Sequence, residues 1–79
     1  MDDMYLSDLA AGESCVVKSF AEELECRRRL YDLGLCPGNK LSCAYIAPSG
    51  SPIAFWVKGA LIALRYEQCL KILVQHNSE

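Results

Sequence analysis

The sequence contains no apolar run that approaches the roughly 20 residues needed to span a bilayer. It does not open with a basic segment followed by an apolar one, which is the pattern of a secretory signal peptide. Its net charge of −2 gives no surplus of lysine and arginine to neutralise phosphates. These absences argue against insertion into a membrane and against a dedicated nucleic-acid binder.

Catalytic machinery is also missing from the sequence. Asp32 has no second carboxylate at a spacing typical of acid–base pairs, and no serine or cysteine has a histidine close by to act as its base. The chain has no glycine-rich phosphate-binding loop, so we expect no GTP hydrolysis by this protein itself. The sequence therefore predicts a protein that is not an enzyme and that needs no cofactor.

The five cysteines are odd in number, are widely and irregularly spaced and include no C-x-x-C pair. A disulfide framework or a zinc ribbon would show paired spacings and histidine partners, but the only histidine, His76, lies in a polar tail. We expect reduced thiols that act as small core residues, which indicates a cytoplasmic protein. The alternative is a metal site at an interface, built from Cys36, Cys43 or an acidic pair, where thiolates would favour zinc over ferrous iron.

The length of 79 residues corresponds to a single domain with a thin core. A hydrophobic content of 52% with 23% charged residues is typical of a globular protein. So small a core is compatible with self-association, and the sequence does not define an oligomeric state.

The chain is organised around a helix and its end, between Glu22 and Gly38. We expect Gly34 to adopt the left-handed conformation just past the helix, and Leu30 and Leu35 to meet in a Schellman motif. Pro37 with Gly38 suits the centre of a type II turn.

The start of this helix is less clearly defined. Ser19 and Glu22 have capping-box spacing, which would begin the helix at Phe20, but the preceding strand competes for residues 19–21. We place the start near Glu22, with Cys26, Leu30 and Leu33 on the inward face.

Alternation and turn residues predict five short strands and two helical turns in addition to the helix. The strands span residues 13–19, 40–47, 53–58, 60–64 and 72–75, and the helical turns, the first capped by Ser7, span 6–9 and 65–70. Residues 1–4 and the tail after Gln75 are expected to be loose. The prediction is a mainly β domain, a small antiparallel barrel of about five strands with one helix after the first strand.

Alternation also predicts which side chains face the core. In the first strand, Cys15 with Val17 and Val16 with Lys18 satisfy the pattern equally well. In the two strands that follow the helix, one set of alternate residues is expected to point inward: Leu41, Cys43, Tyr45, Ile53, Phe55 and Val57. Trp56 and Lys58 then point outward.

Four local patterns in this order resemble the FeoA family, small cytoplasmic proteins that accompany the bacterial ferrous-iron transporter FeoB. They are Leu6-Ser-Asp-Leu9 with Gly12, RLYDLGLCPG from Arg29 to Gly38, APSGSP from Ala47 to Pro52, and Leu64-Arg65 followed by Ile72-Leu-Val74. The resemblance covers about residues 5–75. It implies an SH3-like barrel and a role in ferrous iron uptake through contact with the cytoplasmic part of FeoB.

The same barrel occurs as a C-terminal domain of iron-dependent repressors, but this chain carries no DNA-binding domain, so the stand-alone accessory fits better. Ser51 replaces the aspartate usual in the family's turn, which makes a metal role for that loop less well supported. Cys69 stands where alanine is common. The resemblance does not say whether contact activates the FeoB GTPase or assembles the transporter.

Four exposed residues are the expected partner-binding positions: Trp56, Lys58, Arg27 and Arg28. Tryptophan is enriched among interface hot spots, and guanidinium groups suit an acidic partner surface. The competing interpretations are a solvated helix face for the arginines and a pocket under the N-terminal segment for Trp56. Arg65 is expected to brace the backbone where the last hairpin meets the short helix. The second functional hypothesis is a metal-binding or metal-responsive regulatory domain.

Overall fold

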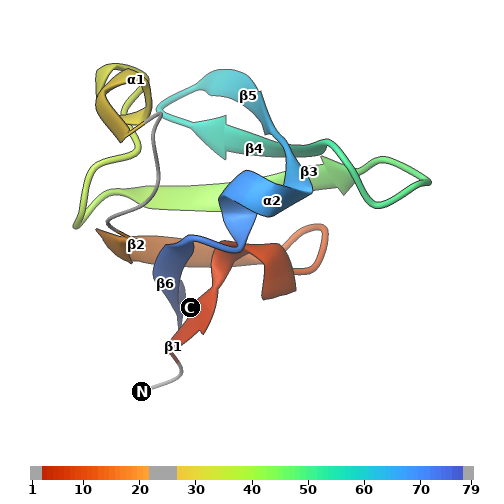
Figure 1. The fold of residues 1–79 in the computed structure, drawn as a ribbon, viewed down its shortest axis with the longest axis horizontal. Coiled ribbons are helices and arrows are strands. Elements are labelled where there is room, and N and C mark those ends of the chain that lie inside the picture. Colours follow the sequence, from red (N-terminus) through yellow and green to blue (C-terminus); the bar gives the residue numbers. More distant parts are fainter. Residues whose placement is uncertain (1–2, 22–26, 78–79) are drawn as a thin grey trace.

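Six antiparallel strands form one strongly curved sheet in the computed structural model, which describes residues 3–21 and 27–77 (Figure 1). They are β1 (Asp3–Tyr5), β2 (Ser14–Phe20), β3 (Lys40–Ile46), β4 (Ile53–Val57), β5 (Ala60–Leu64) and β6 (Ile72–Asn77). Their order across the sheet is β1-β6-β2-β3-β4-β5, so β1 and β5 are its edges and the sheet is open. The predicted mainly β architecture is confirmed.

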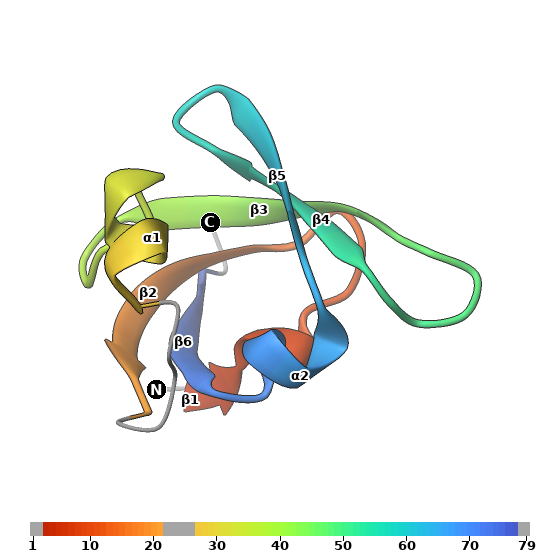
Figure 2. The same ribbon diagram turned by 45° about the horizontal axis from the view of Figure 1, so that its top comes forward.

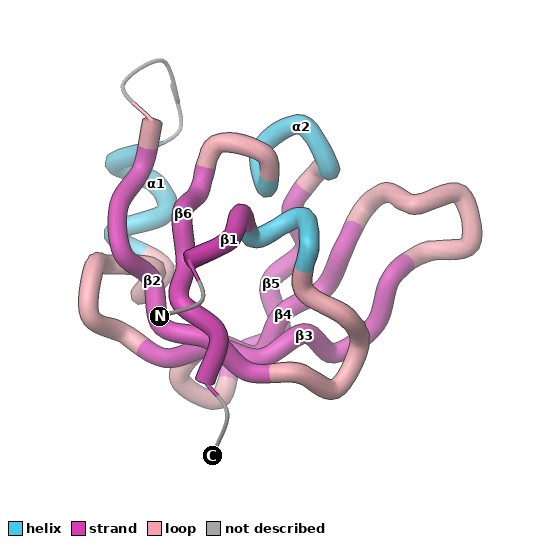
Figure 3. Tube along the Cα trace, turned by 90° about the horizontal axis from the view of Figure 1, so that it is seen from below, coloured by secondary structure: helices cyan, strands magenta, loops and turns pink. Residues whose placement is uncertain are grey.

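Three short helical segments complete the described fold: a 3-10 turn (Leu6–Asp8), α1 (Arg27–Asp32) and α2 (Tyr66–Cys69). Helix α1 lies beside the turn that joins β4 and β5, and α2 connects β5 to β6 (Figure 2). Seen from below, the strands wrap around a common interior (Figure 3). The predicted inward residues Leu41, Cys43, Ile53, Phe55 and Val57 are all buried there.

The end of α1 follows the predicted chemistry closely. The amide of Gly34 donates to the carbonyl of Tyr31 at 3.0 Å, and that of Leu35 donates to the carbonyl of Leu30 at 2.9 Å. Gly34 has φ of 101°, and both Leu30 and Leu35 are fully buried. The Schellman motif is therefore confirmed, because its sequence signals act within a few residues of one another.

The other end of the helix is different. The expected start near Glu22 and the inward Cys26 lie outside the described residues. Phe20 belongs to β2, so a helix beginning at Phe20 is wrong. Leu33 is 37% exposed, which corrects its assignment to the inward face. Leu33 lies at the end of the last turn, where the chain has already begun to leave the helix.

A β-bulge in β3 reverses one expectation about the core. The register with β4 shifts between Cys43 and Tyr45. One extra residue in a strand turns the side chains beyond it to the other face. Tyr45 is therefore 53% exposed rather than inward, whereas Leu41 and Cys43, before the bulge, are buried as expected.

Both ends of the chain contain more structure than the sequence indicated. Asp3–Tyr5 pairs with β6, which corrects the expectation of a loose start at residues 3 and 4. His76 and Asn77 extend β6 beside β2, although we expected the tail to be loose. The 3-10 turn begins at Leu6 with Tyr5 as its N-cap, so Ser7 lies inside the turn and its expected role as the cap is wrong. The two terminal segments are thus paired with strands that are distant in the sequence.

The thiols behave as core residues. Cys15, Cys43 and Cys69 are buried, and none of the four described cysteines forms a disulfide. Burial raises the pKa of Cys15 and of Cys69 to about 12, with a smaller contribution from the neighbouring Cys43. Cys15 and Val17 face inward, which resolves the open choice in the first strand.

Candidate docking surface

The clearest exposed apolar feature lies on the outer face of β4 and β5. Trp56 and Leu61 are directly opposite each other in the register of the two strands. Trp56 is 49% exposed and Leu61 is 48% exposed. On the other side of Trp56, Ser42 is its partner in β3. The interpretation that placed Trp56 in a pocket under the N-terminal segment is therefore wrong, and the tryptophan points outward as alternation predicted.

A second row of outward residues runs beside the first. Ala54 pairs with Tyr45 of β3 and with Ala63 of β5. Ala54 is only 2% exposed, although it is two residues from Trp56 on the same strand. We call the outward set Trp56, Leu61, Tyr45 and Ala63 the β4–β5 face. The β4–β5 face carries no charge. The sequence did not predict that Tyr45 belongs to it, because the bulge in β3 turns this side chain outward.

Lys58 stands at one end of the β4–β5 face, in the two-residue turn between the strands. Lys58 has φ of 51° and Gly59 has φ of 83°, the conformation of a type I′ hairpin turn. A Cβ placed on Gly34 would lie 3.2 Å from Cδ of Lys58, so the Lys58 stem packs against the end of α1. This contact brings α1 next to the turn (Figure 1).

The arginines of α1 are exposed, as expected for a solvated or partner-binding helix face. Arg27 and Arg28 lie at its described beginning, and no ion pair to them is recorded within residues 3–21 and 27–77. Trp56 and Lys58 are two positions apart at the end of the hairpin, and the stem of Lys58 lies against the end of α1. The structure records no contact that joins Arg27 or Arg28 to Trp56.

Arg65 closes the other end of the hairpin and is exposed. Its amide donates to Oε1 of Gln68 at 2.9 Å, and its carbonyl accepts the amides of Gln68 and Cys69. The backbone of Arg65, rather than its guanidinium, therefore organises the beginning of α2. The side chain is left at the surface beside the end of β5.

A shallow depression of about 480 Å³ lies between the β3–β4 loop and α2, lined by Ser49, Gly50, Ser51, Tyr66 and Glu67. The hydroxyl of Ser51 accepts the amide of Tyr66 at 3.0 Å, and Ser49 donates to the carbonyl of Ser51 at 3.0 Å. Ser51 therefore holds the loop against α2. Both bonds hold the loop that forms one wall of the depression.

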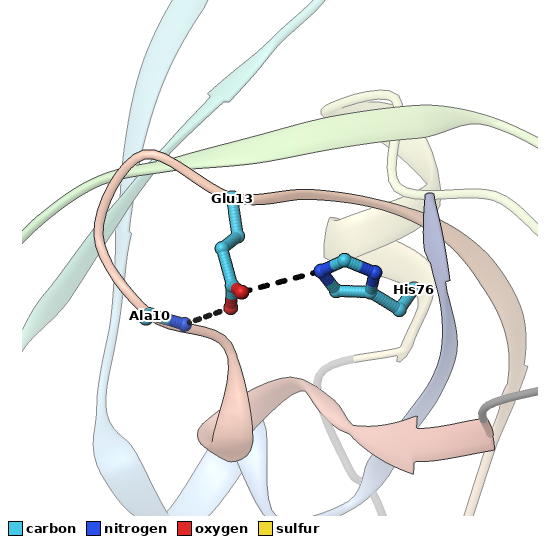
Figure 4. Close-up of polar contacts among 3 residues, drawn as sticks. All are labelled: Ala10, Glu13 and His76. Atoms are coloured by element: carbon cyan, nitrogen blue, oxygen red, sulfur yellow. Dashed lines mark hydrogen bonds and ion pairs between the residues drawn. The ribbon is translucent and has the colours of Figure 1, made fainter. Parts of the chain in front are cut away.

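One polar contact was not visible from the sequence. Glu13 receives the amide of Ala10 on Oε1 at 2.8 Å, and its Oε2 lies 3.2 Å from Nε2 of His76 (Figure 4). The hydrogen bond from Ala10 is the main cause that lowers the pKa of Glu13. The contact depends on the antiparallel pairing of β2 with β6, which no local pattern around His76 predicts.

No group of three or more potential metal ligands occurs within residues 3–21 and 27–77. Cys36, one of the two thiols considered for a metal site, donates to the carbonyl of Tyr31 at 3.6 Å, and Cys43 is buried in the core. Burial also raises the pKa of Cys43, so forming the thiolate that a metal would bind is costly. The described residues favour a structural role for these thiols.

The fold and the outward β4–β5 face define a small SH3-like β domain with a candidate protein-docking surface. No helix of the described chain is both long and apolar enough to cross a bilayer. The model of the FeoA domain family matches residues 4–76, nearly the whole sequence, and the chain belongs to this family. A comparison with curated protein sequences gave no match.

Solved structures agree with this assignment. The FeoA protein from Chlorobium tepidum is 41% identical, with a TM-score of 0.89 over 95% of this chain and 71% of that one. A FeoA from Stenotrophomonas maltophilia, described as a zinc complex of an SH3 domain protein, is 29% identical with a TM-score of 0.79 over 91% and 89% of the two chains. A manganese-dependent transcriptional repressor shares the fold alone, at 14% identity and a TM-score of 0.85 over 95% of this chain and 41% of that one.

Proposed function

We propose that this protein is a non-catalytic, cytoplasmic accessory protein of bacterial ferrous iron transport that docks on the cytoplasmic part of the transporter FeoB. Membership of the FeoA family supports the link to the transport system. The description of the Stenotrophomonas maltophilia relative names a ferrous iron transport activating factor, and a Clostridium thermocellum relative is described as an iron(II) transport protein A.

The observation that carries the docking role is the exposed cross-strand pair of Trp56 and Leu61. A domain of this size gains by burying its large apolar side chains, yet these two remain half exposed on the uncharged β4–β5 face. Tryptophan anchors dominate the energetics of many protein interfaces. Lys58 at the end of the face adds a cation that suits an acidic rim on the partner.

Binding of this protein to the purified cytoplasmic domain of FeoB, measured by calorimetry, tests the proposal. A saturable complex is the expected result, with the GTPase rate of FeoB measured in the same samples to separate docking from activation. The absence of a complex with nucleotide-free, GDP-bound and GTP-bound FeoB would overturn the docking role.

The metal-responsive alternative has less support in this chain. A zinc complex is described for the relative from Stenotrophomonas maltophilia, but the described residues here bring no three potential ligands together. Titration with Fe²⁺ and Zn²⁺ under anaerobic, reducing conditions separates the two functions. The docking proposal predicts that the complex with FeoB forms equally well after treatment with a chelator.

A further inference from the structure

Strand β5 is an open edge of the sheet, with β4 as its only neighbour in the strand order (Figure 2). Its sequence, ALIAL from Ala60 to Leu64, has no charged residue and no proline. Edge strands are usually protected by charges, proline or bulges, because their unpaired amides and carbonyls attract another strand. The pairing of β4 with β5 has no register shift, so β5 lacks each of these protections within its own length.

The register identifies which backbone groups face the open side. Val57 and Ala60 flank the two-residue turn and pair directly. Such flanking residues exchange hydrogen bonds, and the pairs then alternate along an antiparallel ladder. Ile62 and Leu64 therefore bond to β4, whereas Leu61 and Ala63 direct their N–H and C=O groups to the open side. No other backbone hydrogen bond is recorded for Leu61 or Ala63 among the described residues.

The two ends of this edge are positively charged. Lys58 precedes β5 and Arg65 follows it, and both side chains are exposed. No ion pair of either residue with another described residue is recorded. An acidic group at each end of an added strand would therefore find an opposite charge.

The same charges disfavour a second copy of this chain as the added strand. In an antiparallel pair of two β5 strands centred on Ile62, Lys58 of each copy would stand opposite Tyr66 of the other, one position from Arg65, so two cations would gather at each end of the pair. Cations gathered at the same end repel each other, which disfavours the pairing. The charge pattern thus selects a different protein segment over self-association.

We propose that β5 is a site for strand addition, and that its ligand is an extended protein segment with alternating apolar residues and acidic residues at its ends. The segment pairs with Leu61 and Ala63 through its backbone, and its apolar side chains continue the β4–β5 face beside Leu61. This inference deepens the proposed docking function by naming the chemistry of the partner segment. Backbone pairing supplies affinity in such complexes, and the alternate side chains supply selectivity.

The test uses the full chain and a synthetic peptide with glutamates at both ends and alternating valine and threonine between them. Titration followed by amide NMR is expected to shift the Leu61 and Ala63 amides in a saturable way and to slow their exchange with solvent. Ala63→Pro removes an edge amide at a position where an edge strand tolerates proline. This variant is expected to bind the peptide roughly two- to tenfold more weakly, since one interface hydrogen bond is lost.

Ala63→Thr is the matched control, because it changes the side chain but keeps the amide and suits a strand. It is expected to retain most of the binding, and both variants should melt cooperatively. A peptide with lysine in place of each glutamate should bind far more weakly. Equal binding by Ala63→Pro, equal binding of the lysine peptide, no saturable shift, or a concentration-dependent dimer through β5 would each overturn the inference.

Binding to FeoB provides a separate result. If FeoB binds Ala63→Pro as tightly as Ala63→Thr, the docking function stands and strand addition is wrong. If the acidic peptide binds at β5 and FeoB does not bind at all, strand addition stands and the proposed partner is wrong.

Discussion

Glu13 and His76 are 63 positions apart in the sequence, yet Oε2 of Glu13 lies 3.2 Å from Nε2 of His76 (Figure 4). The contact joins the segment just before β2 to the end of β6. It also fixes the carboxylate that accepts the amide of Ala10. The Glu13 side chain thus bonds both to the turn before β2 and to His76 of β6, the strand that pairs with β2.

This arrangement predicts a loss of stability in acid. The pKa of Glu13 is lowered in the folded protein, mainly by the hydrogen bond from Ala10. A lowered folded pKa contributes stability above the unfolded value of 4.5, and this contribution disappears as the pH falls through the folded value. We expect Glu13→Gln to lower the melting temperature at neutral pH, with a difference from the parent that shrinks on acidification. A difference that stays constant down to the acid transition would contradict the role of this carboxylate.

The second prediction concerns Leu30, which is fully buried under the end of α1. Leu30→Ala should lower the free energy of unfolding by about 2–5 kcal/mol, because it leaves a cavity and removes half of the apolar contact in the helix stop. Urea unfolding measures this loss. Leu33→Ala, just past the end of α1, is the control and should cost much less, since Leu33 is partly exposed. Similar losses for both variants would show that the effect comes from the helix rather than from the core.

The third prediction separates backbone strain from crowding at two glycines. Gly34→Ala forces a Cβ into a left-handed conformation and places it 3.2 Å from Cδ of Lys58 and 3.3 Å from Cγ1 of Val57. Gly12→Ala meets a comparable φ of 90° but nothing within 4 Å. We expect about 1–2 kcal/mol of destabilisation from strain in each, and a larger total at Gly34 because Val57 is buried. Thermal or urea unfolding of both variants measures the two losses of stability. Because the strain is similar at both positions, crowding should account for the difference between them.

The parts of the fold that the sequence predicted are those set by local chemistry. The end of α1 requires Gly34 and two leucines within six residues, so the signals and the structure lie together. The alternation of β4 placed Phe55 inside and Trp56 outside, because no bulge interrupts its pairing with β5. The candidate docking residue could therefore be identified before the structure.

The remaining features depend on partners that are distant in the sequence. Tyr45 turned outward because the pairing of β3 with β4 accommodates an extra residue, and alternation within β3 cannot show this. His76 is ordered because β2 offers it a paired position opposite Cys15. The open edge of β5 is likewise a property of the whole sheet and of no single segment.

The last prediction tests the β4–β5 face in the complex with FeoB. Trp56→Ala should weaken binding to the cytoplasmic domain of FeoB by roughly thirtyfold, equivalent to the loss of about 2 kcal/mol that a hot-spot tryptophan contributes. The fold should survive, since Trp56 is half exposed and its strand keeps Phe55 and Val57 in the core.

Lys58→Ala is the matched control, a change at the rim of the same face that should mainly reduce the salt dependence of binding. Calorimetry at two salt concentrations and a melting curve for each variant provide the measurements. If Trp56→Ala binds normally, or loses binding only because it unfolds, Trp56 has a structural role. The docking surface would then lie on α1, where Arg27→Ala and Arg28→Ala should show the losses that Trp56→Ala did not.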